Sequence, residues 1–412
     1  MLVFANLNGI FESLTGRGEL GSPLILLSAL SILYLIPIKK AYVRSFFLVF
    51  SLLTGLYLLF GWGLGIWFMD EGYFTLDGAK SGSRQLMTSY IIVSAFYFLF
   101  VWAKETGESD KYMKTLFYMF FIVLLAGVFE DFLGLRKVLY QRYTNTRNLG
   151  FFGNPNETGM QANLTFVLAV WAYFRKYIRP WTFIILLGLC TYGVLLSFSR
   201  TAIITNALLI LVFLGYLVFG SVGRSGIRYQ PRRWFLFLLI IGIVASAFQF
   251  VAIPFYNNLK TNQRKRIDAV GNLIFKRQFD NKTTALRAGI FDDAVTLIKR
   301  RPFTGYGLQT FSKGGMFPSS PSHGVHNMYL KVIGEAGIIP EVLYLLMILF
   351  FLVGFYMMPS PEGFVVTLFG LSLALYSFAS HGVFAQKFIT GLIGVFGAFL
   401  SKTSNTSASK SL

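Results

Sequence analysis

The sequence predicts an all-α polytopic membrane protein with about 11–12 transmembrane helices. Of its 412 residues, 55% are hydrophobic and only 13% are charged, whereas a soluble domain carries about 25% charged residues. The mean hydropathy is +0.60, and several apolar runs of about 17–22 residues are long enough to cross a hydrocarbon core about 30 Å thick. A membrane β-barrel would require hydrophobic residues at every second position, and the sequence lacks that alternation.

The apolar runs define the elements in chain order. We predict spans at residues 23–38, 43–64, 87–103, 115–134, 159–174, 181–198, 202–219, 234–252, 341–356, 363–380 and 388–400. Residues 1–14 are semi-apolar and would add a twelfth, short span. The spans form an N-terminal transmembrane bundle within residues 1–256 and C-terminal transmembrane helices within 326–400, and a large loop at 257–325 separates them. Residues 401–412 are expected to be a disordered cytoplasmic tail.

Short basic loops set the expected orientation, because cytoplasmic loops carry an excess of Lys and Arg. Three basic clusters fall on one side in the predicted span order. They are Lys39, Lys40 and Arg44; Arg175, Lys176 and Arg179; and Arg224, Arg228, Arg232 and Arg233. That side is predicted to be cytoplasmic, so the turn at Arg200 and the loop 257–325 face outward. The net charge of +19 would also suit nucleic acid, but with this hydropathy we expect membrane lipid and no nucleic acid as partners.

The loop 257–325 combines positive charge with a helical pattern. It has twelve Lys and Arg against four Asp, and loops longer than about 60 residues are translocated regardless of charge. The basic balance therefore suits an anionic substrate or anionic headgroups. Residues 283–300 are predicted to be a helix, because apolar residues recur there with helical spacing. This stripe consists of Leu286, Ile290, Ala294, Leu297 and Ile298.

Three outward side chains could carry chemistry. Arg200 lies between two spans with almost no loop, where a charge near hydrocarbon is costly. It either snorkels to lipid headgroups or binds phosphate through its guanidinium group. Arg287, in the predicted loop helix, is solvated surface unless it joins such a site. His326 lies where the loop re-enters the membrane, and it either caps a turn or acts as a general base, because imidazole titrates near neutral pH.

Other polar residues are secondary candidates. His323 could substitute for His326, Asn327 and Glu335 follow closely, and His381 is expected to lie at the membrane interface. The acidic pairs 70–71, 130–131 and 292–293 have no His at ligand spacing, so we expect no metal and no cofactor. The sequence has no nucleotide-binding loop, Rossmann fingerprint, zinc motif or nucleophile elbow, which argues against ATP-driven chemistry.

Four short segments give the chain a resemblance to a known family. They are Gly150-Phe151-Phe152-Gly153-Asn154-Pro155-Asn156-Glu157 before a span, the Ser-Arg turn at Arg200, Arg287 ahead of Arg301-Pro302-Phe303-Thr304-Gly305-Tyr306-Gly307, and His326-Asn327 with Glu335-Ala336-Gly337. In this order, with a long outward loop between spans, the chain resembles the O-antigen ligase family of bacterial polysaccharide assembly. That family is related to the O-antigen and exopolysaccharide polymerases.

The resemblance implies a multi-pass enzyme of the bacterial inner membrane with a large periplasmic loop and an active site that faces the periplasm. It would move a glycan from undecaprenyl pyrophosphate to an acceptor hydroxyl without a metal. Arg200 and Arg287 match the positions that bind the pyrophosphate, and His326 matches the position that serves the acceptor. Attack from the face opposite the leaving group predicts inversion at the anomeric carbon. For a ligase the acceptor is lipid A-core, as in lipopolysaccharide biosynthesis.

Two alternative functions are weighed against the ligase. A polymerase would join lipid-linked glycan repeat units to each other, and a protein hydroxyl would be a third kind of acceptor. A transporter or lipid flippase would show ionisable residues at mid-span and two similar halves with Gly/Pro-broken helices. The chain has no internal repeat, and the loop 257–325 has no obvious role in transport, so the sequence favours the transferase.

Overall fold

The structure, a computed structural model, describes residues 21–64, 66, 74–130, 132–134, 152, 154–219, 256–257, 261, 264, 268, 281–312, 316–319 and 324–401. These residues form helices and no strand. Among them, six helices are long and apolar enough to cross a membrane, and three shorter apolar helices accompany them. The molecule is an all-α polytopic membrane protein, as predicted. The predicted span 234–252 and the segment 1–14 lie outside the described residues.

The helices follow the predicted spans closely. The N-terminal part contains α2 (Gly21–Leu35), the 3-10 turn η2 (Lys40–Tyr42), α3 (Ser45–Leu58) with its π-helical end η3 (Leu59–Leu64), α5 (Leu76–Glu105), α6 (Ser109–Val128), α8 (Pro155–Phe174), α9 (Pro180–Ser197) and α10 (Arg200–Phe219). The C-terminal part contains α13 (Asn281–Arg300), α14 (Met328–Ala336), α15 (Ile338–Leu352), α16 (Gly354–Met357), α17 (Pro361–Ala379) and α18 (Lys387–Phe399).

Two helices differ from the sequence expectation. The predicted span starts at residue 87, but α5 begins at Leu76, where Thr75 caps it by accepting a hydrogen bond from Gly78 N at 3.2 Å. The first turns of α5 are polar, so a search for apolar runs does not detect them. The second difference is α14, which is too short to appear as a span and was not predicted.

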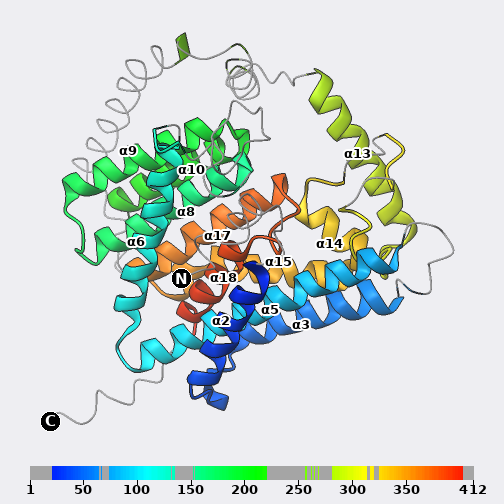
Figure 1. The fold of residues 1–412 in the computed structure, drawn as a ribbon, viewed down its shortest axis with the longest axis horizontal. Coiled ribbons are helices and arrows are strands. Elements are labelled where there is room, and N and C mark those ends of the chain that lie inside the picture. The colour runs from blue at the N-terminus through cyan, green and yellow to red at the C-terminus, as the bar shows by residue number, and fades with distance from the viewer. Residues whose placement is uncertain are drawn as a thin grey trace.

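The helix α8 lies at the centre of one group of helices (Figure 1). It packs against α6, α9, α10 and α17, and nearly all its side chains from Pro155 to Ala172 are buried. Two of its buried amide side chains are paired, as burial of a polar group favours. Gln161 Nε2 donates to Phe120 O at 2.7 Å, and Asn163 Nδ2 donates to Ala202 O at 3.0 Å.

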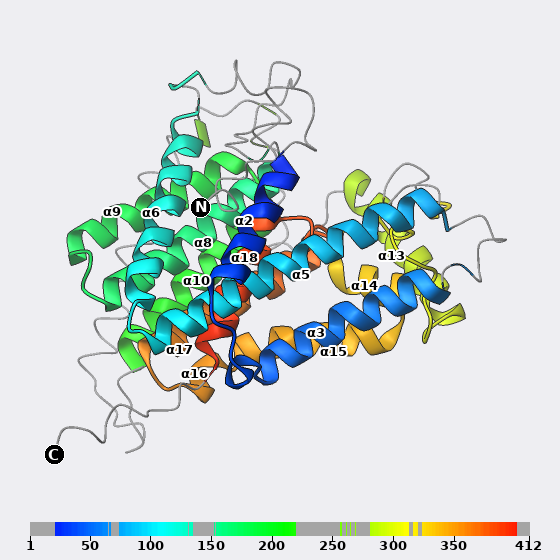
Figure 2. The ribbon, with the colours of Figure 1, turned by 60° about the horizontal axis from the view of Figure 1, so that its bottom comes forward.

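A second group contains α3, α5 and α15, which run side by side in Figure 2, with α13 beyond their ends. The helix α15 packs against both α3 and α17, and α18 packs against α5. The two groups therefore share α17 and α18 as a common wall.

Ion pairs mark one end of the bundle, which we call the basic end. Lys39 Nζ lies 2.7 Å from Glu105 Oε2. Arg175, which follows α8, joins the starts of α6 and α17. Its Nη2 lies 3.3 Å from Asp110 Oδ1 and 3.1 Å from Glu362 Oε1. The predicted basic loops at residues 39–44 and 175–179 thus share one end, and the third, at 224–233, lies outside the described residues. The opposite end, where α8, α10 and α18 begin and α17 ends, is called the loop end.

Candidate functional site

The turn between α9 and α10 fixes Arg200 at the loop end. Phe198 adopts a left-handed conformation with φ of 47°, which is uncommon for a residue other than glycine. Ser197 Oγ accepts a hydrogen bond from Ser199 N at 3.2 Å, and Ser199 Oγ accepts one from Ala202 N at 3.4 Å. Ser199 therefore caps α10, and Arg200 follows as the first residue of that helix with a half-buried side chain.

Gly159 of α8 allows this turn to lie directly against the central helix. A Cβ atom at Gly159 would lie 2.5 Å from Ala202 Cβ and 2.7 Å from Ser197 Oγ, closer than packed atoms tolerate. The backbone position of Arg200 is consequently set by a close contact that only glycine permits.

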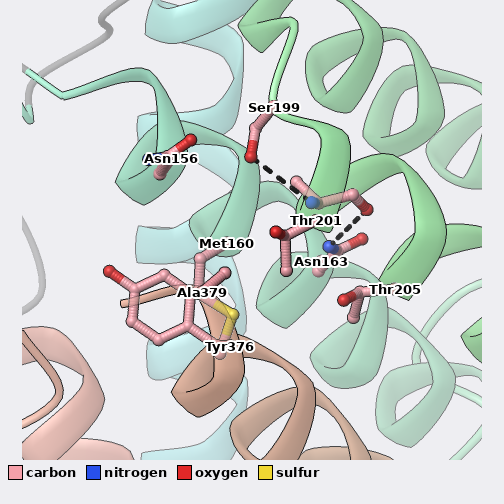
Figure 3. A pocket seen from close by; sticks show the side chains of 9 residues that line it. Asn156, Met160, Asn163, Ser199, Thr201, Thr205, Tyr376 and Ala379 are labelled. Atoms are coloured by element: carbon pink, nitrogen blue, oxygen red, sulfur yellow. Dashed lines mark hydrogen bonds between the residues drawn. The ribbon is translucent and has the colours of Figure 1, made fainter. Parts of the chain in front are cut away.

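A small polar pocket lies beside the turn (Figure 3). It is lined by Asn156 and Asn163 of α8, Ser199 and Thr201 at the start of α10, and Tyr376 of α17. Its volume is about 10 Å³, which is room for about one water molecule and too little for a sugar. The pocket shows that the loop ends of α8, α10 and α17 meet at one place.

Main-chain pairing between two glycine-containing segments sets the position of α14. We call residues 302–307 and 334–338 the glycine clamp. Gly305 and Gly337 have φ of 66° and 83°, and a Cβ atom at Gly337 would lie 2.0 Å from Phe303 O. Both positions therefore require glycine. The pairing consists of Tyr306 N to Gly334 O at 2.8 Å, Gly307 N to Glu335 O at 2.9 Å, and Ile338 N to Pro302 O at 2.8 Å.

Two further contacts hold the loop against the bundle. Leu308 N donates to Gly61 O at 2.8 Å, at the π-helical end of α3, where the widened helix leaves a carbonyl free. The predicted apolar stripe of α13 is confirmed from Ile290 to Ile298, since Ile290, Ala294 and Leu297 are buried in one cluster with aromatic residues of the loop and with Val325. The side chain of Leu286 lies outside the described part of the structure. The segment immediately before His326 is thereby anchored on α13.

His326 is exposed and lies at the start of α14. Asn327 caps this helix, because its Oδ1 accepts a hydrogen bond from Leu330 N at 3.1 Å. Tyr329 Oη donates to Ala374 O at 3.1 Å, which fastens α14 to α17. The cap and this contact present His326 at the loop end.

Glu335, one of the secondary candidates, joins three segments. Its side chain is 1% exposed. Tyr57 Oη of α3 donates to its Oε2 at 2.8 Å, and Ser312 Oγ donates to its Oε1 at 3.0 Å. Because both carboxylate oxygens accept from the protein itself, the geometry favours a role in holding α14, α3 and the loop together.

A second histidine lies beside His326. The ring centroids of His326 and His381 are 5.2 Å apart with an interplanar angle of 45°. His381 belongs to the turn between α17 and α18, and Lys331 Nζ of α14 lies 3.5 Å from its carbonyl oxygen. Burial lowers the pKa of His381 to about 4, and the charges of Lys331 and His326 act in the same direction. The side chain is therefore neutral at neutral pH, and it is half-buried.

Among the described helices, α8, α10, α14 and α18 have their starts close to one another at the loop end. Their starts are linked: α8 and α10 line one pocket, Gln386 Nε2 before α18 donates to Glu157 Oε1 of α8 at 2.5 Å, and His381 reaches α14. Helix N-termini carry partial positive charge and bind anions. Arg200 and the largely buried Lys331 and Lys387 add full charges at the same end. The loop end is therefore suited to an anionic group.

The structure brings Arg200 and His326 to the same end, on either side of the α17–α18 turn. Arg287 lies on α13, one helical turn before Ile290, and its side chain is outside the described part of the structure. His323 also lies outside the described residues. In the part of the chain that is described, no group of three His, Cys, Asp or Glu side chains is arranged to hold a metal. Asp293, from one of the acidic pairs, accepts hydrogen bonds from Ser319 N and Oγ at 2.9 and 2.6 Å.

Sequence reasoning missed the proximity of His381 and the burial of Lys331. His381 was expected at the interface, and only its contact with a second segment distinguishes it. The rarity of histidine, with three in the chain, was the one available signal.

The fold defines a polytopic membrane protein, and Arg200, Lys331 and Lys387 place basic side chains at the loop end of its bundle. Residues 183–345 match the family model described as O-antigen ligase. This match over part of the chain confirms the resemblance seen in the sequence, and the matched family implies a glycosyltransferase-like enzyme of the ligase or polymerase type. The matched region contains Arg200, Arg287 and His326, whereas His381 and Lys387 lie beyond it. The comparison with curated proteins gives no match.

Proposed function

We propose that the protein is an inverting, metal-independent glycosyltransferase that moves a glycan from undecaprenyl pyrophosphate to an acceptor hydroxyl at the periplasmic face of the bacterial inner membrane. We infer that it acts as an O-antigen ligase with lipid A-core as acceptor. The observation that carries this proposal is that the starts of α8, α10, α14 and α18, together with Arg200, lie at the same end as the exposed His326. A pyrophosphate leaving group and a hydroxyl nucleophile need that combination.

The proposed reaction balances with the protein's own side chains. His326 takes the proton of the acceptor hydroxyl, and the oxygen attacks the anomeric carbon from the face opposite the pyrophosphate. The bond from that carbon to the phosphate oxygen breaks, and its electron pair leaves with undecaprenyl pyrophosphate. Arg200 and Arg287 stabilise the charge that develops on the leaving group. The imidazolium of His326 returns its proton to water.

The orientation is supported by the charges at the two ends. The basic end carries the loops 39–44 and 175–179, which favours the cytoplasm for that side. The loop end then faces the periplasm, where both the lipid-linked donor and the acceptor would reach it.

The test uses purified protein with a lipid-linked oligosaccharide prepared from the host's own repeat unit. Lipid A-core is added as one acceptor and a second lipid-linked repeat unit as the other, and products are identified by mass. Transfer to lipid A-core supports the ligase, and repeat-unit ladders would assign a polymerase instead. Removing one electrostatic donor typically costs about 10²–10³ in rate, so Arg200→Ala and Arg287→Ala should lose at least that. His326→Ala should be inactive.

Arg179→Ala is the matched control, because Arg179 is an exposed arginine at the basic end. It should keep wild-type transfer, and all variants should reach the membrane in equal amounts. Full activity of His326→Ala would remove the imidazole from the mechanism.

A further inference from the structure

The two neighbouring histidines come from segments far apart in the chain. His326 precedes α14 and is exposed, whereas His381 lies in the α17–α18 turn and is half-buried. With ring centroids 5.2 Å apart, a nitrogen of one ring can come within hydrogen-bond reach of a nitrogen of the other. The pair is held on both sides, since Tyr329 fastens α14 to α17 and Ser380 Oγ accepts from Gly382 N at 3.1 Å within the turn.

One nitrogen of His381 is free to accept a hydrogen bond. Its Nδ1 is buried, and no described residue donates to it. The ring also has a hydrogen bond with the backbone of Val325. A neutral imidazole that donates through one nitrogen presents a lone pair at the other. A buried acceptor without a donor is costly, so this nitrogen suits the N–H of a neighbouring imidazole, and that hydrogen bond strengthens when the neighbouring ring becomes protonated.

We propose that His381 is a positioning residue for His326, whose ring it orients and whose protonated form it stabilises through a hydrogen bond to His381 Nδ1. This inference rests on the proposed function. When His326 takes the proton of the acceptor hydroxyl, it becomes an imidazolium with an N–H on each nitrogen. One N–H carries the proton just taken, and the other donates to His381 Nδ1. No proton passes to His381, and the proton on His326 later leaves to water.

The charges around His381 favour this arrangement. Lys331 and His326 are the titratable groups that act on it, and both disfavour a positive charge there. His381 consequently stays neutral while His326 is charged, so the two rings together carry no more than one positive charge. A single charge shared across an N–H···N hydrogen bond is stabilised, whereas two adjacent imidazolium groups would repel.

The proposal makes a quantitative prediction about the pKa of His326. A hydrogen bond to the charged form raises the pKa of a base, so removing the acceptor should lower the pKa of His326. The expected change is about one pH unit, which corresponds to about a tenfold change in equilibrium. The maximal rate should fall by about tenfold for the same reason, because the imidazolium forms in the rate-limiting transfer.

The chain allows this pKa to be measured without any substrate. Diethyl pyrocarbonate reacts with neutral imidazole, and the sequence has three histidines, so peptide mass spectrometry can follow each one. The pH dependence of modification at His326 is measured in the purified full-length protein and in His381→Phe, His381→Leu and His381→Gln. Phe keeps a flat ring without an acceptor, Leu removes both, and Gln keeps an acceptor. Phe378→Leu, an exposed neighbour on α17, is the control.

The pH midpoint for modification of His326 should fall by about one pH unit in His381→Phe and His381→Leu and be restored in His381→Gln. The transfer rates should follow the same order. The proposal is overturned if the midpoint for His326 is unchanged in His381→Phe and His381→Leu. It is also overturned if His381→Gln is as impaired as His381→Phe. If His381→Phe does not accumulate in the membrane, the comparison of His381→Leu with His381→Gln decides the test. If no His381 variant accumulates, the residue is a folding determinant and the proposal fails. A shifted midpoint in a protein without transferase activity would instead refute the proposed function alone.

Discussion

Replacing Glu335 separates a structural carboxylate from a catalytic one. In the wild type its two oxygens accept from Tyr57 Oη at 2.8 Å and Ser312 Oγ at 3.0 Å. In Glu335→Gln the amide keeps one acceptor, and Ser312 can turn to accept from the new NH₂ group. We expect the free energy of unfolding to fall by no more than about 0.5–1.5 kcal/mol, because two neutral hydrogen bonds replace two bonds to a carboxylate.

In Glu335→Leu both hydrogen bonds are lost. The hydroxyl of Tyr57, a residue only 1% exposed, is left without an acceptor, which costs about 1–3 kcal/mol. The lost bond from Ser312 adds about 0.5–1.5 kcal/mol, so a total loss of about 1.5–4.5 kcal/mol is expected. Tyr57→Phe removes one of the same bonds from the other side, and in a double-mutant cycle with Glu335→Leu its effect should largely disappear.

The assay pairs equilibrium unfolding in mixed micelles, followed by tryptophan fluorescence, with the transfer reaction. Glu335→Gln should keep its maximal rate within about threefold, because removing a general acid or base costs about 10²–10⁴. A fall in rate of that size with unchanged unfolding would show that the carboxylate takes part in the reaction and that the structural reasoning is wrong.

Three other outcomes are expected. Gly159→Val should lower both the unfolding midpoint and transfer, because its side chain meets Ala202 at the start of α10, whereas Gly188→Ala on α9, with no neighbouring atom within 4 Å of the added Cβ, should be neutral in both assays. The folded protein should lose stability on acidification between about pH 6.5 and 4. In this range the unfolded chain, with an ordinary histidine pKa, binds a proton, whereas folded His381, whose pKa is lowered to about 4, stays neutral. His381→Gln should remove this pH dependence from a series of unfolding curves. EDTA should leave transfer unchanged, and loss of turnover restored by a divalent cation would bring the acidic residues back into the mechanism.

The sequence predicts the membrane-spanning part well because bilayer thickness imposes a length on apolar runs. The helix 283–300 was equally accessible, since its stripe from Ile290 to Leu297 buries one face. The polar start of α5 and the short α14 escaped, because neither has an apolar run of membrane length.

The site was only partly predictable. Arg200 and His326 could be selected from the sequence alone. Arg200 is a charged residue between two apolar runs, and His326 is one of only three histidines. The hydrogen bonds of Glu335 and the contact of His326 with His381 join residues distant in the chain, and no local pattern encodes them. Glycines at positions 305 and 337 were visible in the sequence, but their partners in the clamp were not.

The glycine clamp has a consequence for divergence within a family. Its three hydrogen bonds use main-chain atoms, so they depend little on which side chains surround them. The stretch of chain that leads into the clamp can then change in length and composition while the re-entry point keeps its geometry. Relatives could therefore differ in this stretch while the histidine before α14 stays in register with the bundle.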